Sequence, residues 1–372
     1  MRPFRISVSP QAVNQLRQRL QNTRWPDAGT APDSSQGLPL HLVQDLCDEW
    51  ANGYDWPATQ ARLNRIPQIV TEIGGLKIHA VHLRSPDPEA TPLLLTHGWP
   101  GSFLEFEDVL EPLTSGQPAF HVVVPSLPGY GFSGQPSQPG WGVHRIADAW
   151  AELMTRLGYD KFIAAGSDWG TSISTCIGRQ HPQRLFGLHL VPPLAAPVSG
   201  QDLTPAETAA LQELSERAGD ASAYSEVHRT RAQTIGYALA DSPAALAAWI
   251  GEKLLSWTDG PDALSRRQIL DNLSLYWFTR TGASSARLYA ESIAEVGRWF
   301  TDPDAIEPVL VPTAATVFPR EVPRPSRRWT EHRFPQLVHW GEPPRGGHFG
   351  AWEQPELFTG EIRSGATALR GL

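Results

Sequence analysis

Cysteine, lysine and long apolar runs are all scarce in this 372-residue sequence. Its two cysteines, Cys47 and Cys176, are too few for a disulfide framework, and no CxxC pair or Cys/His cluster is present to ligate a metal ion. We therefore expect two free, buried thiols and no metal site. No run approaches the roughly 18 consecutive apolar residues of a transmembrane helix, and polar sequence rather than an apolar signal core follows Met1. These absences predict a soluble, cytoplasmic protein.

Positive charge is lacking as well. The chain carries 31 Lys and Arg against 39 Asp and Glu, which gives a net charge of −8, and it has no basic run. Because a phosphate backbone is attracted by a positive field, nucleic acid is not an expected partner. Buriable surface, in contrast, is plentiful: 41% hydrophobic residues and 14 tryptophans exclude a disordered chain.

The first 90 residues resemble a meander that packs on a larger body. Apolar residues recur at helical spacing over residues 10–24 and 38–50. A Trp-Pro pair follows each of these segments and favours irregular backbone. Residues 68–73 and 76–83 then flank two glycines, which predicts a β-hairpin at the start of a sheet.

From residue 91 onward, short apolar runs alternate with turns and helices. Continuous runs, unlike alternating ones, indicate strands that are covered on both faces, and thus a mostly parallel α/β sheet. Helical patterns such as 206–218 and 244–257 interrupt the series and predict a helical insertion. The apolar runs lie at residues 93–96, 122–124, 162–165, 185–190, 309–317 and 337–340, with a last helix near 354–362.

These patterns divide the chain into four parts. They are an N-terminal meander that leads into the first strands (1–90), the first part of the core (91–194), a helical lid (195–304) and the second part of the core (305–372).

Residues 166–170, Gly-Ser-Asp-Trp-Gly, have the spacing of a nucleophile elbow. In this turn from a strand to a helix, small flanking residues allow the central side chain to project. Here it is the carboxylate of Asp168, which is ionised near neutral pH and suits displacement at a saturated carbon; the alkyl ester so formed must then be hydrolysed. Two interpretations compete, namely that Asp168 only caps the helix, and that Ser167 is the nucleophile.

A second motif, His-Gly-Trp-Pro-Gly-Ser at residues 97–102, follows the apolar run 93–96. A strand that ends in this way presents backbone N–H groups beside the elbow. The N–H groups of Trp99 and Trp169 are therefore the predicted oxyanion hole. His97 itself is expected to be a structural, hydrogen-bonded histidine.

Hydrolysis of an ester on Asp168 requires a general base and a group that orients it. His348 follows the last predicted strand, in the loop Arg-Gly-Gly-His-Phe-Gly, and is the predicted base. Glu321 comes just after the run 309–317 and is the predicted partner of the imidazole. The competing histidines are His121, His189 and His339, and the competing acids are Asp302, Asp304 and Glu331.

Taken together, these segments resemble the microsomal-type epoxide hydrolases of the α/β-hydrolase fold over nearly the whole chain. The Arg-Trp-Pro and Tyr-Asp-Trp-Pro segments resemble that family's N-terminal meander, and the motifs His-Gly-Trp-Pro-Gly-Ser, Gly-Ser-Asp-Trp-Gly, Phe-Pro-Arg-Glu and Arg-Gly-Gly-His-Phe resemble its core motifs in order. The resemblance implies Asp168 as nucleophile, His348 as base and Glu321 as charge partner. Because the chain starts at the meander, it resembles the soluble microbial members rather than the membrane-anchored animal enzymes.

The family also uses two lid tyrosines that donate hydrogen bonds to the epoxide oxygen. By sequence context Tyr289 matches one of them and Tyr224 matches the other. Judged without the family, a lid tyrosine is more often a packing residue, and Tyr237 and Tyr276 would compete as donors.

The resemblance therefore implies hydrolysis of an epoxide to a vicinal diol through an ester on Asp168, with a small-molecule epoxide and water as partners and no cofactor or metal. Two alternatives stay open: haloalkane dehalogenase-like hydrolysis, with halide bound by tryptophan N–H groups, and a catalytically silent binder of a hydrophobic ligand. The oligomeric state is open, a homodimer included. The lid tryptophans Trp249, Trp257 and Trp277 fit an apolar substrate and core packing equally well.

Overall fold

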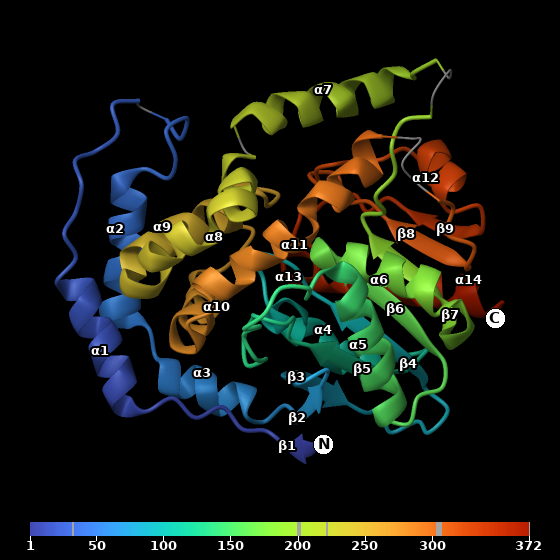
Figure 1. The fold of residues 1–372 in the computed structure, drawn as a ribbon, viewed down its shortest axis with the longest axis horizontal. Helices are drawn as coiled ribbons and strands as arrows, with labels where there is room; N and C mark the ends of the chain where they lie inside the picture. Colours follow the sequence, from blue (N-terminus) through green and yellow to red (C-terminus); the bar gives the residue numbers. More distant parts are fainter. Residues whose placement is uncertain (32, 199–201, 221, 303–306, 372) are drawn as a thin grey trace.

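Within the described residues of the computed structural model (1–31, 33–198, 202–220, 222–302 and 307–371), nine strands form one sheet in the order β1-β2-β3-β5-β4-β6-β7-β8-β9 (Figure 1). The pairs from β1 to β5 are antiparallel, and those from β5 through β4 to β9 are parallel. This mostly parallel sheet confirms the predicted fold class. The strands are β1 (Arg2–Pro3), β2 (Gln68–Ile73), β3 (Leu76–Leu83), β4 (Thr91–Thr96), β5 (Phe120–Pro125), β6 (Phe162–Ser167), β7 (Leu185–Val191), β8 (Thr313–Thr316) and β9 (Leu337–Gly341).

Two strand predictions have different outcomes. The hairpin is confirmed with its predicted bounds, because β2 and β3 pair antiparallel across the two glycines. The run 309–317, in contrast, was predicted too long, since β8 covers only residues 313–316. Pro312 has no N–H to donate, and its carbonyl accepts the N–H of Leu188, so the regular ladder begins one residue later.

Helices cover both faces of the sheet (Figure 1). On one face α5 and α6 pack together, and α6 contacts β4, β6 and β7; on the other face α14 packs against α4 and contacts β7 to β9. The buried thiols of Cys47 and Cys176 are both free, as expected. The helices of the core are η2 (Phe103–Phe106), α4 (Glu107–Ser115), α5 (Val143–Arg156), α6 (Trp169–Gln180), η3 (Pro182–Arg184), α12 (Arg327–Arg333), α13 (Gly350–Glu353) and α14 (Pro355–Arg370).

The segment between β7 and β8 is helical. Its helices are α7 (Pro205–Asp220), α8 (Ala223–Asp241), α9 (Pro243–Ser256), α10 (Arg266–Thr279) and α11 (Gly282–Thr301), and α8 is kinked at Arg231. They fall within the range 195–304 assigned to the lid, whose last residue lies outside the described residues. We call α7 to α11 the lid from here on.

The N-terminal helices pack along the outside of the lid (Figure 1). They are α1 (Pro10–Gln21), α2 (Leu40–Asp48), η1 (Glu49–Gly53) and α3 (Trp56–Leu63). A buried carboxylate joins the two regions: Asp271 of α10 accepts hydrogen bonds from the Tyr54 hydroxyl at 2.6 Å, from Thr59 Oγ1 at 2.7 Å and from Arg62 Nη2 at 2.6 Å. Because every donor comes from the N-terminal region, this network fixes the position of the lid helix.

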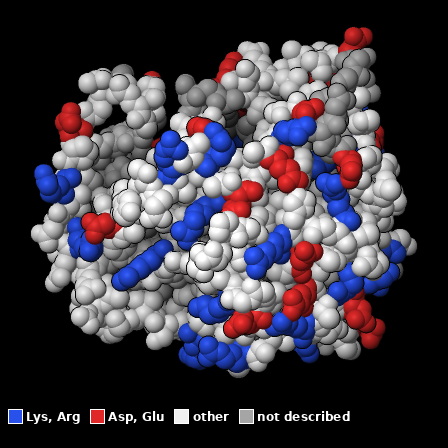
Figure 2. Space-filling model, in the orientation of Figure 1, with Lys and Arg blue, Asp and Glu red and all other residues white. Residues whose placement is uncertain are grey.

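The outer surface carries mixed charge. On the face drawn in Figure 2, Lys and Arg side chains are interspersed with Asp and Glu rather than gathered into a region of one sign. Several pair along helices, such as Arg298 with Asp302 and Arg327 with Glu331, and exposed pairs of this kind add little stability. Among the described helices, none has both the length and the apolarity that a bilayer crossing requires.

Candidate active site

Asp168 stands at the sharp turn between β6 and α6, with φ 52° and ψ −122°. A non-glycine residue at positive φ is strained, and at a nucleophile elbow this conformation projects the side chain. Only glycine allows the backbone at residues 98 and 170 to approach its neighbours this closely. A Cβ on Gly98 would lie 1.9 Å from Asp168 Oδ1, and a Cβ on Gly170 would lie 1.9 Å from the carbonyl oxygen of Thr96. The glycines of both motifs therefore bring the Asp168 carboxylate against the end of β4.

Backbone N–H groups bind the Asp168 carboxylate. The N–H of Trp99 donates to Asp168 Oδ1 at 2.7 Å. Burial raises the pKa of Asp168 above its ordinary value, whereas the positive charge of His348 and the N–H groups of Trp99 and Trp169 oppose this effect. The N–H groups of Trp99 and Trp169, which are the predicted oxyanion donors, therefore stabilise negative charge on the Asp168 carboxylate.

The loop that carries Trp99 is held by the lid. Asn272 Nδ2 of α10 donates to the Pro100 carbonyl at 2.8 Å, and the Tyr276 hydroxyl donates to the Gly101 carbonyl at 2.9 Å. Tyr276 therefore has a structural partner, and Tyr237, the other competing tyrosine, is 70% exposed. Neither residue is among those that line the cavity described below.

His348 and Glu321 lie together beside Asp168. The imidazole Nδ1 is 2.8 Å from Glu321 Oε1, and Nε2 is 3.7 Å from Asp168 Oδ2. The N–H of His348 also donates to the carbonyl of Trp257 in the lid at 2.9 Å. Asp168, Glu321 and His348, which are far apart in the sequence, therefore lie in one spatial group.

The competing residues have other partners. His97 contacts the carbonyl of Gly98 through Nδ1 and accepts the N–H of Leu127 at Nε2, which is a structural role. Asp304 lies outside the described residues. The remaining competitors bond elsewhere: His121 to Ser85, His189 to Thr316, His339 to Glu361, Asp302 to Arg298 and Glu331 to Arg327.

The charge state of His348 is set by its neighbours. Burial alone would lower the pKa of its imidazole, but the charge of Glu321, the hydrogen bond to Glu321 and the charges of Asp168 and Glu105 together raise it to about 9. Because this value lies above the ordinary 6.5, the protonated imidazole stabilises the folded protein fully below about pH 6.5. This contribution is lost as the pH rises through about 9.

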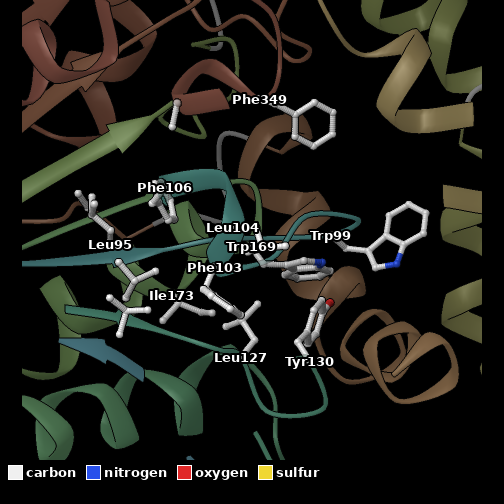
Figure 3. Close-up of a cluster of buried hydrophobic side chains, with 14 of the residues drawn as sticks. Leu95, Trp99, Phe103, Leu104, Phe106, Leu127, Tyr130, Trp169, Ile173 and Phe349 are labelled. Atoms are coloured by element: carbon white, nitrogen blue, oxygen red, sulfur yellow. The ribbon is translucent and has the colours of Figure 1, made fainter. Parts of the chain in front are cut away.

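A cavity of about 270 Å³ opens above this group and reaches into the lid. Tyr224 and Tyr289 both line it. The Tyr224 ring stacks on Trp99 with centroids 4.9 Å apart, and the Tyr289 ring packs edge-on against Trp169, also at 4.9 Å. Figure 3 shows these two indoles at one end of the buried hydrophobic cluster. Each lid tyrosine therefore sits against one of the residues whose N–H groups face Asp168.

Most of the remaining cavity wall is apolar. Of the three lid tryptophans singled out in the sequence, only Trp257 contributes to it; Trp249 instead donates its indole N–H to His228 Nε2 at 2.9 Å. Within the described residues, no group of three or more His, Cys, Asp or Glu side chains could hold a metal ion. The apolar wall consists of Pro192, Leu194, Leu214, Trp257, Ile293, Val296, Phe300, Val322 and Pro323.

Two buried carboxyl groups at this site were missed by motif reasoning. Glu353 accepts the N–H groups of Gly347 and Phe349, which flank His348, and that of Asp259 in the lid. Its only local signal is its place in the helical turn that follows the histidine loop. Glu105 is 3% exposed, and burial raises its pKa to about 8, with Asp168 raising it further and His348 opposing. Nothing in the local sequence indicates that Glu105 is buried beside Asp168 and His348.

Replacing Glu321 with glutamine is expected to lower the pKa of His348 by roughly 1–3 pH units, because the charge that holds the imidazolium is lost and burial then dominates. An NMR titration of the imidazole C2–H measures this directly. Glu331→Gln, which removes an exposed carboxylate, is the matched control and should leave the titration unchanged. An unaltered pKa in Glu321→Gln would contradict the ion pair.

Known proteins are similar to this chain over nearly its whole length. Residues 1–106 match the family model described as epoxide hydrolase N terminus, and residues 91–224 match the alpha/beta hydrolase fold. The chain is 46% identical, over 99% of its length and 85% of the relative, to a Stigmatella aurantiaca protein provisionally named an epoxide hydrolase. It is 34% identical to epoxide hydrolase 1 of Sus scrofa, over 98% of this chain and 88% of that one.

A solved structure gives the same picture. The Aspergillus niger epoxide hydrolase superposes with a TM-score of 0.90 at 31% identity, covering 99% of this chain and 96% of that one. The two family models together cover residues 1–224, and the relatives extend the similarity to 98–99% of the chain. This chain belongs to the epoxide hydrolase family of the α/β-hydrolase fold.

Proposed function

We propose that this protein hydrolyses neutral, apolar epoxides to vicinal diols through a covalent ester on Asp168. One observation carries the proposal: a carboxylate, not a serine, occupies the nucleophile turn, and two lid phenols, Tyr224 and Tyr289, line the same cavity. A carboxylate displaces at saturated carbon, and the strained ring leaves as an alkoxide that needs a proton donor. A carboxylate nucleophile together with phenol donors suits an epoxide better than an acyl substrate.

In the first step Asp168 Oδ2 attacks a ring carbon, since Oδ1 is engaged by the N–H of Trp99. The carbon–oxygen bond of the ring breaks, and its electron pair goes to the oxygen. That oxygen takes a proton from one of the two phenols, which becomes phenolate, while the other phenol donates a hydrogen bond. The product of this step is an alkyl ester of Asp168 that carries a free hydroxyl.

In the second step water attacks the carbonyl carbon of this ester. His348 takes the proton of the water, Glu321 balances the imidazolium, and the N–H groups of Trp99 and Trp169 receive the oxyanion. Ester formation removes the charge of Asp168, one of the charges that raise the pKa of His348, so alkylation itself favours the neutral imidazole that this step needs. The proton that the imidazole gives up neutralises the phenolate left by the first step.

The protons then balance. As the tetrahedral intermediate collapses, the departing alkoxide takes the proton from His348, and the diol is complete. The proton left on the Asp168 carboxyl returns to the imidazole of His348. Every group returns to its starting state, and the cycle consumes only the epoxide and water. The mechanism therefore requires no metal or organic cofactor.

One observation favours haloalkane dehalogenation as a second candidate. The indole Nε1 of Trp169 is buried and has no hydrogen-bond partner among the described residues, and such an N–H can bind halide. The two reactions differ in their leaving group, because halide needs no proton. A panel of styrene oxide, 1,2-epoxyoctane, cyclohexene oxide and 1-bromooctane separates them by diol formation against bromide release. Binding without turnover of any member would favour a silent binder instead.

Replacing both Tyr224 and Tyr289 with phenylalanine is expected to slow epoxide opening by roughly 10²- to 10⁴-fold, because the alkoxide then has no donor in an apolar cavity. Each single replacement should cost less. Steady-state diol formation measures the effect. Tyr237→Phe, at an exposed position on the same lid, is the matched control and should turn over normally. Full activity in the double variant would reject the tyrosines as donors.

A further inference from the structure

Lys253 is a buried cation to which the proposed mechanism gives no task. The chain has three lysines, and Lys77 and Lys161 are exposed, whereas Lys253 of α9 is 5% exposed. Its ammonium pairs with Glu252 at 2.5 Å, and that carboxylate is itself 35% exposed. A lysine that needed only this partner could keep its charged end in water. The ion pair with Glu252 alone therefore does not explain why the ammonium of Lys253 is buried.

A second cause of this burial is visible in the contacts of the ammonium. Nζ lies 4.9 Å from the centroid of the Tyr224 ring and 5.9 Å from that of Trp257, both within the range of a cation–π interaction. The same Tyr224 ring stacks on Trp99. Within the described part of the chain, no Lys or Arg lies over the ring of Tyr289. The two lid tyrosines thus have different electrostatic surroundings.

This difference bears on ring opening. A phenol that donates to a developing alkoxide gains negative charge, and part of that charge spreads into its ring. Burial and the negative charge of Asp168 raise the pKa of Tyr224, which opposes donation. A positive charge over the ring acts in the opposite sense, and it acts most strongly where water is excluded.

We infer that Lys253 is a positioning residue for ring opening: its ammonium stabilises the charge that the Tyr224 ring takes up and makes Tyr224 the stronger of the two donors. The inference rests on the proposed function. It predicts an effect on ester formation, in which the phenol donates, and none on ester hydrolysis, in which His348 acts.

The test measures ester formation alone, in a His348→Gln background where the ester accumulates. Intact mass spectrometry follows labelling by whichever epoxide of the panel reacts fastest. Lys253→Met in this background is expected to slow labelling by roughly 5- to 30-fold, and Lys253→Arg, which keeps the cation, by no more than about 3-fold. Glu252→Gln is the matched control, because it removes the ion-pair partner and leaves the ammonium; it should slow labelling less than Lys253→Met does.

A double-mutant cycle separates this role from a purely structural one. When Tyr224 is already phenylalanine, Lys253→Met should cause no further slowing. Equal slowing in both backgrounds, or labelling at the parental rate in Lys253→Met, would overturn the inference while the proposed function stands. Absence of label in the His348→Gln parent would instead reject the proposed function.

Folding of the neutral variants is checked by thermal unfolding. Lys253→Gln, a second neutral variant with a polar end, should slow labelling as Lys253→Met does. Failure of both neutral variants to fold would assign the lysine to the structure of the lid and would overturn the inference.

Discussion

Asp168→Ala is expected to form no measurable diol, with turnover reduced by roughly 10⁶-fold, the scale of loss seen when a covalent nucleophile is removed. The physical reason is that no other group at the turn can form the ester. Asp168 is the carboxylate that the N–H of Trp99 holds at 2.7 Å, with its second oxygen 3.7 Å from His348. Diol formation from the epoxide panel, followed by chromatography, is the measurement.

Ser167→Ala is the matched control for this experiment. Ser167 lies next to Asp168 and was the competing nucleophile in the sequence, but it belongs to β6 and is 7% exposed. Its replacement should leave turnover within a few-fold of the parent. Near-normal turnover in Asp168→Ala, or loss of activity in Ser167→Ala, would contradict the assignment of the nucleophile.

The sequence predicted the sheet well because buried parallel strands are nearly continuous apolar runs. Residues 162–165, for example, fall inside β6, all of whose residues are buried. The predicted strand ends were least reliable where backbone chemistry, not hydrophobicity, decides where a strand begins or ends. The run 309–317 is apolar at both ends, yet Pro312 breaks the ladder, and hydrophobic pattern alone cannot register a missing N–H.

The residues around Asp168 were predictable for a related reason. Asp168 directly follows β6, whereas Glu321 and His348 lie in the loops that follow β8 and β9, and the carboxyl ends of parallel strands meet at one edge of the sheet. Local motifs therefore carry the position of each residue. The motifs do not carry distances, and the 2.8 Å contact between His348 and Glu321 is known only from the structure.

The burial of other residues near the site could not be predicted from local motifs. Glu105 and Lys253 owe their environments to contacts made across the chain, and a single charged residue in a helical segment usually lies on a solvated face. Glu353 is a similar case, since its three backbone partners come from two separate loops. Burial of these charges is a property of tertiary packing, which periodicity and motif spacing do not encode.

His348→Gln is expected to trap the ester. The amide of glutamine cannot take the proton of water, so hydrolysis should slow by roughly 10⁴-fold or more, whereas attack by Asp168 does not need the base. Turnover should therefore stop after one event per molecule. Glu331→Gln, at an exposed position on α12, is the control and should retain turnover without labelling.

The most direct test of a covalent ester on Asp168 is the intact mass of His348→Gln after exposure to the panel of epoxides and 1-bromooctane, followed by peptide mapping. The account predicts a mass gain equal to one whole epoxide, confined to the peptide that carries Asp168. A gain of an octyl group without bromine, and none from the epoxides, would point to dehalogenation. A protein of unchanged mass, or a label on any other residue, would contradict the account.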